Sequence, residues 1–194
     1  MTLYVKEVIV IILSYLLGGF STGYFLVRFF KGEDVRNVGS RAVGATNVGR
    51  VLGKKGFLIT FLGDALKGMI VSGSALYLNL NPWGVVLAIL AVVVGHILPL
   101  QLDFRGGKGI ATAVGALLIL DYKLILVVSL FFVITIAITR LYTFSGLFAF
   151  ALSPVVAFIL GRPQTHVNGL VILVVFILIA HRKNIRELLI NNTY

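Results

Sequence analysis

Residues 3–30 read LYVKEVIVIILSYLLGGFSTGYFLVRFF, and this stretch decides the class of protein. A helix that crosses a bilayer needs about 20 mostly apolar residues, and this stretch exceeds that length. No small-residue cleavage site follows a short apolar run, so we expect a retained span rather than a signal peptide.

Six further apolar stretches follow, at residues 56–80, 82–102, 109–120, 124–139, 144–160 and 167–180. The sequence therefore predicts an all-α polytopic integral membrane protein with about seven transmembrane helices, forming a single transmembrane domain over residues 1–194. The fourth stretch would rise only about 18 Å, against a bilayer core of about 30 Å. It is either a half-span or follows a loop that dips into the membrane, and a five-span fold is the alternative.

The composition of the 194-residue chain agrees with a membrane protein, because 59% of the residues are apolar and only 12% are charged. Soluble domains carry about 25% charged residues, so a water-soluble globule and a disordered chain are both excluded. The chain has no cysteine, which excludes disulfides, thiolate metal sites and thiol nucleophiles. The formal net charge of +10 indicates anionic lipids or anionic substrates.

The distribution of Lys and Arg predicts the orientation of the chain. With the N-terminus outside, 13 of the 17 basic residues fall on the inner side, and the odd number of spans puts the C-terminus in the cytoplasm. The inner basic residues are Arg28, Lys31, Arg36, Arg41, Arg50, Lys54, Lys55, Arg105, Lys108, Arg140, Arg182, Lys183 and Arg186.

Residues 32–56, GEDVRNVGSRAVGATNVGRVLGKKG, form the longest basic inner segment. Its six glycines predict an ordered loop of turns rather than a helix or strand. Hydrogen-bond donors line it and suit an anion with several oxygens, such as phosphate. The donors are Ser40, Arg41, Thr46, Asn47 and Arg50. A loop that only sets topology is the alternative.

A second inner segment contains Arg105, Gly106, Gly107, Lys108 and Gly109, directly before the fourth span. Glycines let backbone N–H groups approach an anion, the helix N-terminus adds a favourable field, and Lys108 adds a point charge. The Walker A pattern is absent, so a nucleoside triphosphatase is not indicated. The segment predicts a phosphate cradle, with a plain tight turn as the alternative.

Several ionisable residues lie within or at the ends of the spans. Asp64 and Lys67 are three residues apart, which favours an ion pair that anchors a helix over a catalytic role. His96 reads as a buried structural histidine. His181 and Asn184 are also three apart, so a helix would place both on one side, and histidine suits proton transfer near neutral pH.

Common catalytic motifs are missing. The sequence has no HxxxxD, no G-x-S-x-G elbow, no zinc-ligand spacing and no cluster of carboxylates. We therefore expect no metal and no cofactor, and chemistry that depends on stabilising negative charge.

The inner segments together resemble the bacterial membrane acyltransferases that use acyl phosphate to acylate glycerol 3-phosphate, the PlsY family. The resemblance is carried by residues 32–36, 39–40, 44–47 and 50, by the run DALKG at 64–68, by 95–96, 99, 104 and 106–112, and by HRKNI at 181–185. It extends from about residue 15 to residue 190. The family usually has Ser-Gly-Asn where this chain has Ser40, Arg41 and Ala42.

The resemblance implies a multi-pass enzyme of the bacterial cytoplasmic (inner) membrane, with its active site on the cytoplasmic face. Its partners would be glycerol 3-phosphate, long-chain acyl phosphate and membrane lipids, without nucleic acid, and we expect a monomer. The implied catalytic residues are Ser40, Arg50, Lys108, His181 and Asn184. The implied substrate-binding residues are Arg41, Thr46, Asn47, Gly106, Gly107, Lys108 and Gly109. The base is either His181 or a substrate phosphate.

Two other functions remain open from the residues alone. A transporter or channel for phosphate or a phosphorylated metabolite would use the charges to line a pathway, but a pathway needs polar residues at several depths. A lipid-binding scaffold would leave the Gly-rich donor loops unexplained.

Overall fold

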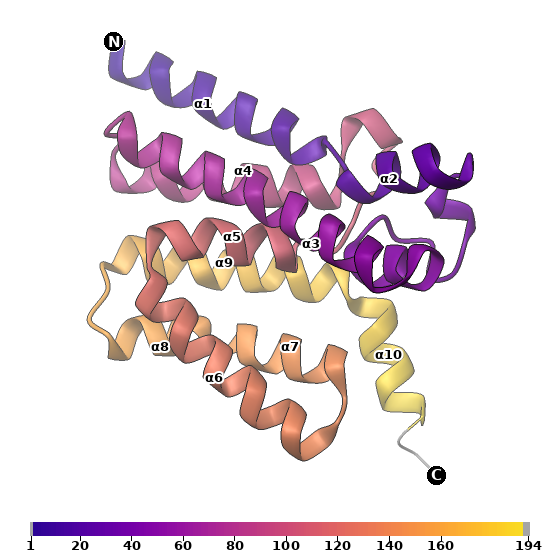
Figure 1. Ribbon diagram of the computed structural model, residues 1–194. Coiled ribbons are helices and arrows are strands. Elements are labelled where there is room, and N and C mark those ends of the chain that lie inside the picture. The colour runs from indigo at the N-terminus through magenta and orange to yellow at the C-terminus, as the bar shows by residue number, and fades with distance from the viewer. Residues whose placement is uncertain (1, 192–194) are drawn as a thin grey trace. The chain divides into compact units, whose positions relative to one another are not determined.

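The computed structural model describes residues 2–191, and all regular elements in that range are helices (Figure 1). The chain forms two compact units, residues 1–120 and 121–194. Unit 1 contains α1 (Thr2–Gly19), α2 (Thr22–Lys31), the 3-10 turn η1 (Val35–Asn37), α3 (Ala45–Tyr77), α4 (Pro82–Ile97), η2 (Leu100–Leu102) and α5 (Ile110–Leu120). Unit 2 contains α6 (Tyr122–Thr139), α7 (Tyr142–Ala151), α8 (Ser153–Ile159), α9 (Gln164–Ala180) and α10 (Arg182–Asn191).

Five segments of the described chain are long and apolar enough to cross a membrane, and they confirm a multi-pass helical fold. They are Tyr4–Lys31, Ala45–Tyr77, Pro82–Leu102, Tyr122–Thr139 and Tyr142–Ile159. Two shorter apolar helices, Ile110–Leu120 and Gln164–Ala180, account for the remaining apolar stretches of the sequence. Large apolar side chains such as Leu126, Ile138 and Ile159 are exposed, which is expected where lipid replaces water.

Glycines bring the helices of unit 1 into backbone contact. α1 lies beside α4, and α3 beside α5 (Figure 1). A Cβ atom on Gly68 of α3 would overlap the Thr112 carbonyl of α5, and one on Gly115 of α5 would overlap the Ala65 carbonyl of α3. Small residues at helix contacts are typical of membrane proteins, because association there depends on close packing.

Two of the predicted elements are interrupted, and so is the helix α3 of the structure. The first apolar stretch is two helices rather than one, because the chain breaks after Gly19 and Ser21 caps α2 by accepting a hydrogen bond from the Tyr24 N–H at 3.3 Å. α7 and α8 are separated at Leu152. Inside α3, Gly53 has φ 71° and ψ −167°, which divides the helix into two parts.

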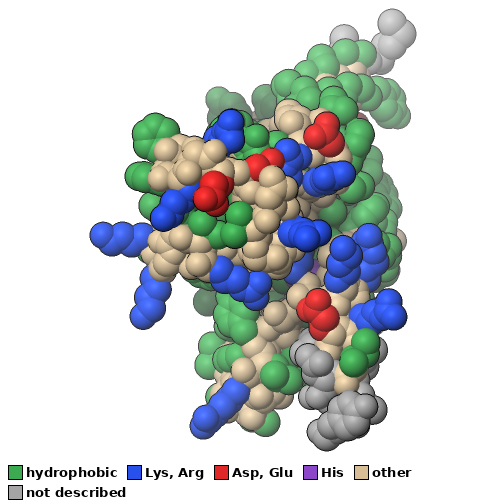
Figure 2. All heavy atoms as spheres, turned by 90° about the vertical axis from the view of Figure 1, so that its right-hand side faces the viewer, with side chains coloured by type: hydrophobic (Ala, Val, Ile, Leu, Met, Phe, Trp, Pro, Cys, Tyr) green, Lys and Arg blue, Asp and Glu red, His purple; other side chains and the backbone are tan. Residues whose placement is uncertain are grey.

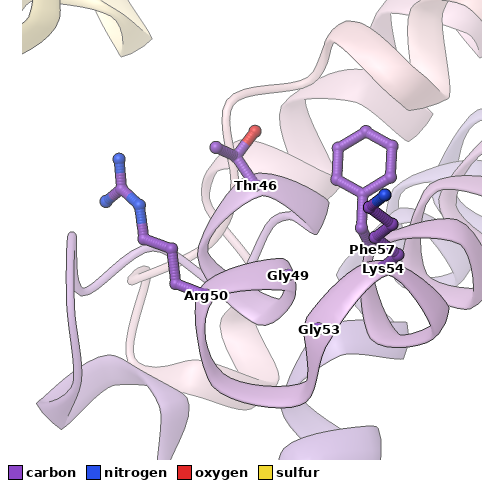
Figure 3. A pocket seen from close by; sticks show the side chains of 6 residues that line it. All are labelled: Thr46, Gly49, Arg50, Gly53, Lys54 and Phe57. Carbon is purple, nitrogen blue, oxygen red and sulfur yellow. The ribbon is translucent and has the colours of Figure 1, made fainter.

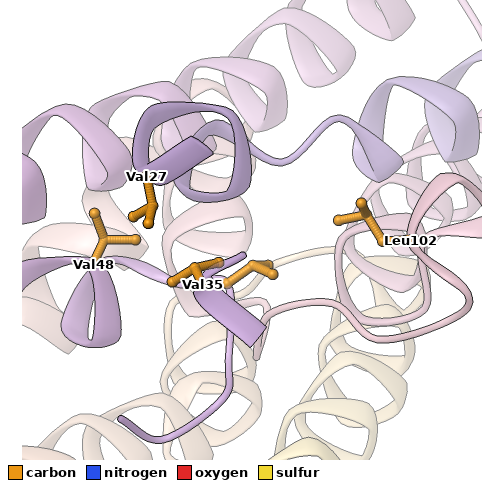
Figure 4. Packing of buried hydrophobic residues seen from close by; sticks show 5 residues of the cluster. Val27, Val35, Val48 and Leu102 are labelled. Carbon is orange, nitrogen blue, oxygen red and sulfur yellow. The ribbon is translucent and has the colours of Figure 1, made fainter. Parts of the chain in front are cut away.

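The prediction of a continuous loop over residues 32–56 is wrong for its second half, since α3 begins at Ala45. The cause is tertiary packing, which overrides the poor helix propensity of a glycine-rich segment. Val48 of this helical turn is buried against Val27 of α2 and Val35 of η1, in a cluster that also contains Val43 and Leu102 (Figure 4).

Candidate functional site

Basic side chains gather at the end of unit 1 where α2 ends and α3 begins. Figure 2 shows Lys and Arg side chains over the face that presents this end of the chain. The exposed basic residues of this end are Arg28, Lys31, Arg41, Arg50, Lys54, Lys55 and Arg105. A surface of this kind attracts anions.

Asn47 organises the loop between η1 and α3. Its side chain is buried, and its amide nitrogen donates to the carbonyls of Val35 at 3.2 Å, Val38 at 2.9 Å and Ala42 at 2.9 Å. Its oxygen accepts a hydrogen bond from the Ser40 N–H at 2.8 Å. The Asn47 amide is therefore directed at the loop itself, and it determines where the neighbouring donors lie.

The side chains of Ser40, Arg41, Thr46 and Arg50 are exposed. Thr46 and Arg50 line a pocket of about 300 Å³ on the first part of α3, together with Gly49, Gly53, Lys54 and Phe57 (Figure 3). Arg41 adopts a left-handed backbone with φ 59°. Lys54 and Phe57 are additions to the residues predicted from the sequence.

The glycine-rich turn before α5 packs against the end of α4. The Gly106 N–H donates to the Ile97 carbonyl at 3.2 Å, and the Gly107 N–H donates to the His96 carbonyl at 2.9 Å. These two amides therefore hold the turn on α4. Gly109 has φ 88°, and its carbonyl accepts the first helical hydrogen bond of α5 from Ala113. Lys108 thus lies directly before the N-terminal turn of α5, where the helix dipole favours an anion.

Arg36 connects the two basic segments and was not among the site residues predicted from the sequence. Its guanidinium makes bidentate contacts with Asp34, in which Nε donates to Oδ1 at 3.1 Å and Nη2 donates to Oδ2 at 2.8 Å. It also lies over the Tyr24 ring. Its Nη1 donates to the Leu102 carbonyl at 2.9 Å and lies 3.5 Å from the Asp103 carboxylate. The D-x-R spacing was the available signal, because an aspartate at the cap of a turn accepts the backbone N–H two residues on, and this brings the two side chains together.

The contact with Arg36 changes the ionisation of its partner. Hydrogen bonding from Arg36 lowers the pKa of Asp34 below its ordinary value of 3.8, and Asp34 in turn raises the pKa of Arg36. Both groups are charged at neutral pH, so Arg36 reaches the Leu102 carbonyl and Asp103 as a guanidinium cation that Asp34 holds in place.

The predicted ion pair within the second span is confirmed. Lys67 Nζ lies 3.1 Å from Asp64 Oδ1, and both side chains are buried. His96 is also buried, as expected from the sequence, and its Nδ1 lies 2.8 Å from Lys67 Nζ.

In unit 2, His181 lies at the junction of α9 and α10, and Asn184 lies in the first turn of α10. The His181 ring is buried, and its Nδ1 lies 2.8 Å from the Ile177 carbonyl. A carbonyl can only accept a hydrogen bond, so Nδ1 carries the proton and Nε2 carries the lone pair in the neutral ring. This tautomer leaves Nε2 chemically able to accept a proton.

Comparisons with known proteins agree over nearly the whole chain. The profile of a family described as glycerol-3-phosphate acyltransferase matches residues 8–191. Glycerol-3-phosphate acyltransferase 1 of Desulfitobacterium hafniense (strain Y51) is 50% identical over 183 residues, covering 94% of this chain and 91% of the relative. Glycerol-3-phosphate acyltransferase of Synechococcus sp. (strain JA-3-3Ab) is 40% identical over 178 residues, covering 91% and 86% of the two chains.

Two solved structures are also similar, both of PlsY, an integral membrane glycerol 3-phosphate acyltransferase. The glycerol 3-phosphate form has a TM-score of 0.91 and 33% identity, and the lysophosphatidic acid form has a TM-score of 0.87 and 30% identity. Each covers 97% of this chain and 94% of the other chain.

Proposed function

This chain belongs to the glycerol-3-phosphate acyltransferase family, and on that premise we propose that it carries out the acyl transfer of that family. The chain is an acyltransferase that acts on glycerol 3-phosphate. The 1-hydroxyl attacks the carbonyl carbon of acyl phosphate, the bond from that carbon to the phosphate oxygen breaks, and inorganic phosphate leaves. The product is 1-acylglycerol 3-phosphate, a lysophosphatidic acid.

The observation that carries this proposal is the pair of donor-rich basic segments in unit 1, joined by Arg36. Both substrates carry a phosphate, so two anion-binding segments are required. Lys108, Gly109 and the first turn of α5 hold one phosphate, while Gly106 and Gly107 fix this turn on α4. Ser40, Arg41, Thr46 and Arg50 hold the second phosphate or the developing oxyanion, and Asn47 positions them.

In unit 2, His181 and Asn184 orient the attacking hydroxyl. Two groups can accept its proton: Nε2 of His181, or a substrate phosphate, which titrates near neutral pH. The proposed topology has seven crossings, with the N-terminus outside and the C-terminus in the cytoplasm. In it, residues 1–194 form one transmembrane domain that acts as a monomer in the bacterial inner membrane, with its active site on the cytoplasmic face.

The direct test is an assay with purified protein in detergent. Acyl phosphate or acyl-CoA is supplied with glycerol 3-phosphate, and released phosphate and lysophosphatidic acid are measured. We expect equal amounts of both products with acyl phosphate and none with acyl-CoA. Absence of lysophosphatidic acid with both donors contradicts the proposal, and product from acyl-CoA alone contradicts the proposed donor.

Lys108→Met tests the phosphate cradle, with Lys123→Met as the matched control, because Lys123 is an exposed lysine in α6 of unit 2. Loss of a charge-assisted contact of about 1.5–3 kcal/mol raises the KM of one phosphate substrate by roughly 10- to 150-fold. Normal kinetics in Lys108→Met contradict the cradle.

His181→Ala identifies the base through the pH dependence of kcat/KM. If the histidine accepts the proton, the acidic limb of the profile disappears in the variant. An unchanged profile assigns the proton to the substrate phosphate instead.

A further inference from the structure

The buried polar group of unit 1 has no part in the reaction proposed above. Asp64 and Lys67 on α3 and His96 on α4 are each no more than 4% exposed. The ammonium of Lys67 is the centre of the group. Besides Asp64 and His96 it contacts the carbonyls of Gly18 and Phe20, both at 2.9 Å, where α1 ends. One side chain on α3 therefore connects the end of α1 to the end of α4.

These contacts determine how the His96 ring is held. An ammonium group only donates hydrogen bonds, so Nδ1 of His96 accepts from Lys67 and the ring proton is on Nε2. The Nε2 edge faces the glycine-rich turn, because a Cβ atom on Gly107 would overlap the ring at Nε2. The His96 carbonyl also accepts the Gly107 N–H. The backbone and the ring of His96 thus both contact Gly107.

Stability alone does not account for such a group. Charged side chains within membrane spans are costly, and replacement of a buried ion pair by apolar residues is often neutral or stabilising. The group has a geometrical consequence instead, because Lys67 orients the ring and the ring is the surface on which Gly107 lies. Lys108 is the residue between Gly107 and Gly109. The distance between the turn and the end of α4 therefore sets the position of the Lys108 backbone.

We propose that Asp64, Lys67 and His96 are positioning residues that set the Gly106–Gly109 turn, and with it Lys108 and the first turn of α5, for a substrate phosphate. They act through the turn and make no contact with the reacting atoms. This inference rests on the proposed function, since it assigns the phosphate-binding turn a supporting group within the membrane.

A pair of size-complementary variants tests the contact between His96 and Gly107. In Gly107→Ala the new methyl overlaps the ring, and in His96→Ala the turn loses its support. We expect each to raise the KM of the same phosphate substrate by roughly tenfold or more, without changing the shape of the pH profile. In the double variant the methyl occupies the space that the ring left, so the KM should return to within about threefold of the wild type.

The control is Gly73→Ala, because a Cβ atom there meets only Ile119 Cγ2, at 4.0 Å. It should leave both KM values unchanged. A purely structural role predicts that the increases in KM of the two single variants combine in the double variant, and that result overturns the proposal. A pH profile that loses a limb in His96→Ala also overturns it, because it would make His96 a proton carrier.

Two further measurements keep the test decisive if a variant does not fold. The charge-neutral double variant Asp64→Asn with Lys67→Met leaves no single buried charge, and it should raise the same KM as His96→Ala; unchanged KM values contradict the role of Lys67.

In the wild type without substrate, hydrogen exchange at the Gly107 amide should be slow. Fast exchange overturns the proposal without any variant. Failure of the acyltransferase assay would contradict the proposed function and leave this exchange result standing, so the two failures are distinguishable.

Discussion

Replacement of Asn47 by alanine should strongly lower the activity of the enzyme without unfolding it. The substitution removes a buried amide that donates to three loop carbonyls and accepts the Ser40 N–H. The amide nitrogen carries two hydrogens, so three N–H donors are involved in all, each contributing about 1 kcal/mol net. Once the loop opens, water can form hydrogen bonds with the same groups. The substitution therefore lowers the stability of the ordered loop and not that of the whole fold.

A loss of about 3 kcal/mol corresponds to a fall of roughly 150-fold in the ratio of ordered to open loop. If substrate binds only the ordered form and the wild-type loop is ordered about half of the time, kcat/KM should fall by a factor on the order of 100. The control is Asn37→Ala, an exposed asparagine in the same segment, which should leave kcat/KM within about threefold of the wild type.

The assay is lysophosphatidic acid formation at varied glycerol 3-phosphate, with hydrogen exchange at the Ser40 amide measured in parallel. Asn47→Asp separates the two halves of the side chain, because it keeps the acceptor for Ser40 and loses the donors. It should be at least as inactive as the alanine variant. Full activity of Asn47→Asp, or protection of the Ser40 amide in Asn47→Ala, would refute the reasoning.

Three further predictions concern stability in detergent. Since the pKa of Asp34 lies below 3.8, the charged carboxylate stabilises the fold above that pH and loses this effect as the pH falls through the folded pKa. Asp34→Asn should therefore cost about 1 kcal/mol at pH 7 in thermal unfolding, and the difference from the wild type should shrink as the pH falls below 3.8 and vanish below the folded pKa; a constant difference contradicts the ion pair. Gly115→Leu should lower the free energy of unfolding by about 3 kcal/mol, and the melting temperature with it, because its Cβ overlaps the Ala65 carbonyl and separates α3 from α5; an unchanged melting temperature refutes that packing. Gly53→Ala should cost about 1–3 kcal/mol because of its backbone conformation, whereas a stabilised variant would show a continuous helix there.

The membrane-spanning elements could be predicted because hydropathy is a local property of the sequence. All seven apolar stretches correspond to apolar helical segments of the described chain, five of them long enough to cross. The breaks were not predicted, because an average over 20 residues hides a cap such as Ser21. The helical turn at residues 45–52 depends on the burial of Val48 against α2 and η1, which no local pattern reveals.

The site could be predicted by residue type more readily than by role. An asparagine in a glycine-rich loop can donate to a ligand or to its own loop, and Asn47 uses its amide for the loop. Gly106 and Gly107 were expected to approach a phosphate, but the backbone they approach is that of α4. Arg36 was missed because its partners, Leu102 and Asp103, are more than 60 residues away in sequence.

The contacts of Arg36 have a consequence for how the binding of one substrate affects the binding of the other. Because its guanidinium joins the segment before α3 to the turn after α4, an anion that orders one segment also restrains the other. We therefore expect synergy, in which each phosphate substrate lowers the dissociation constant of the other by the same factor, since thermodynamic coupling is reciprocal. Removal of this one side chain would then leave two independent anion sites, each able to fill while the other is empty.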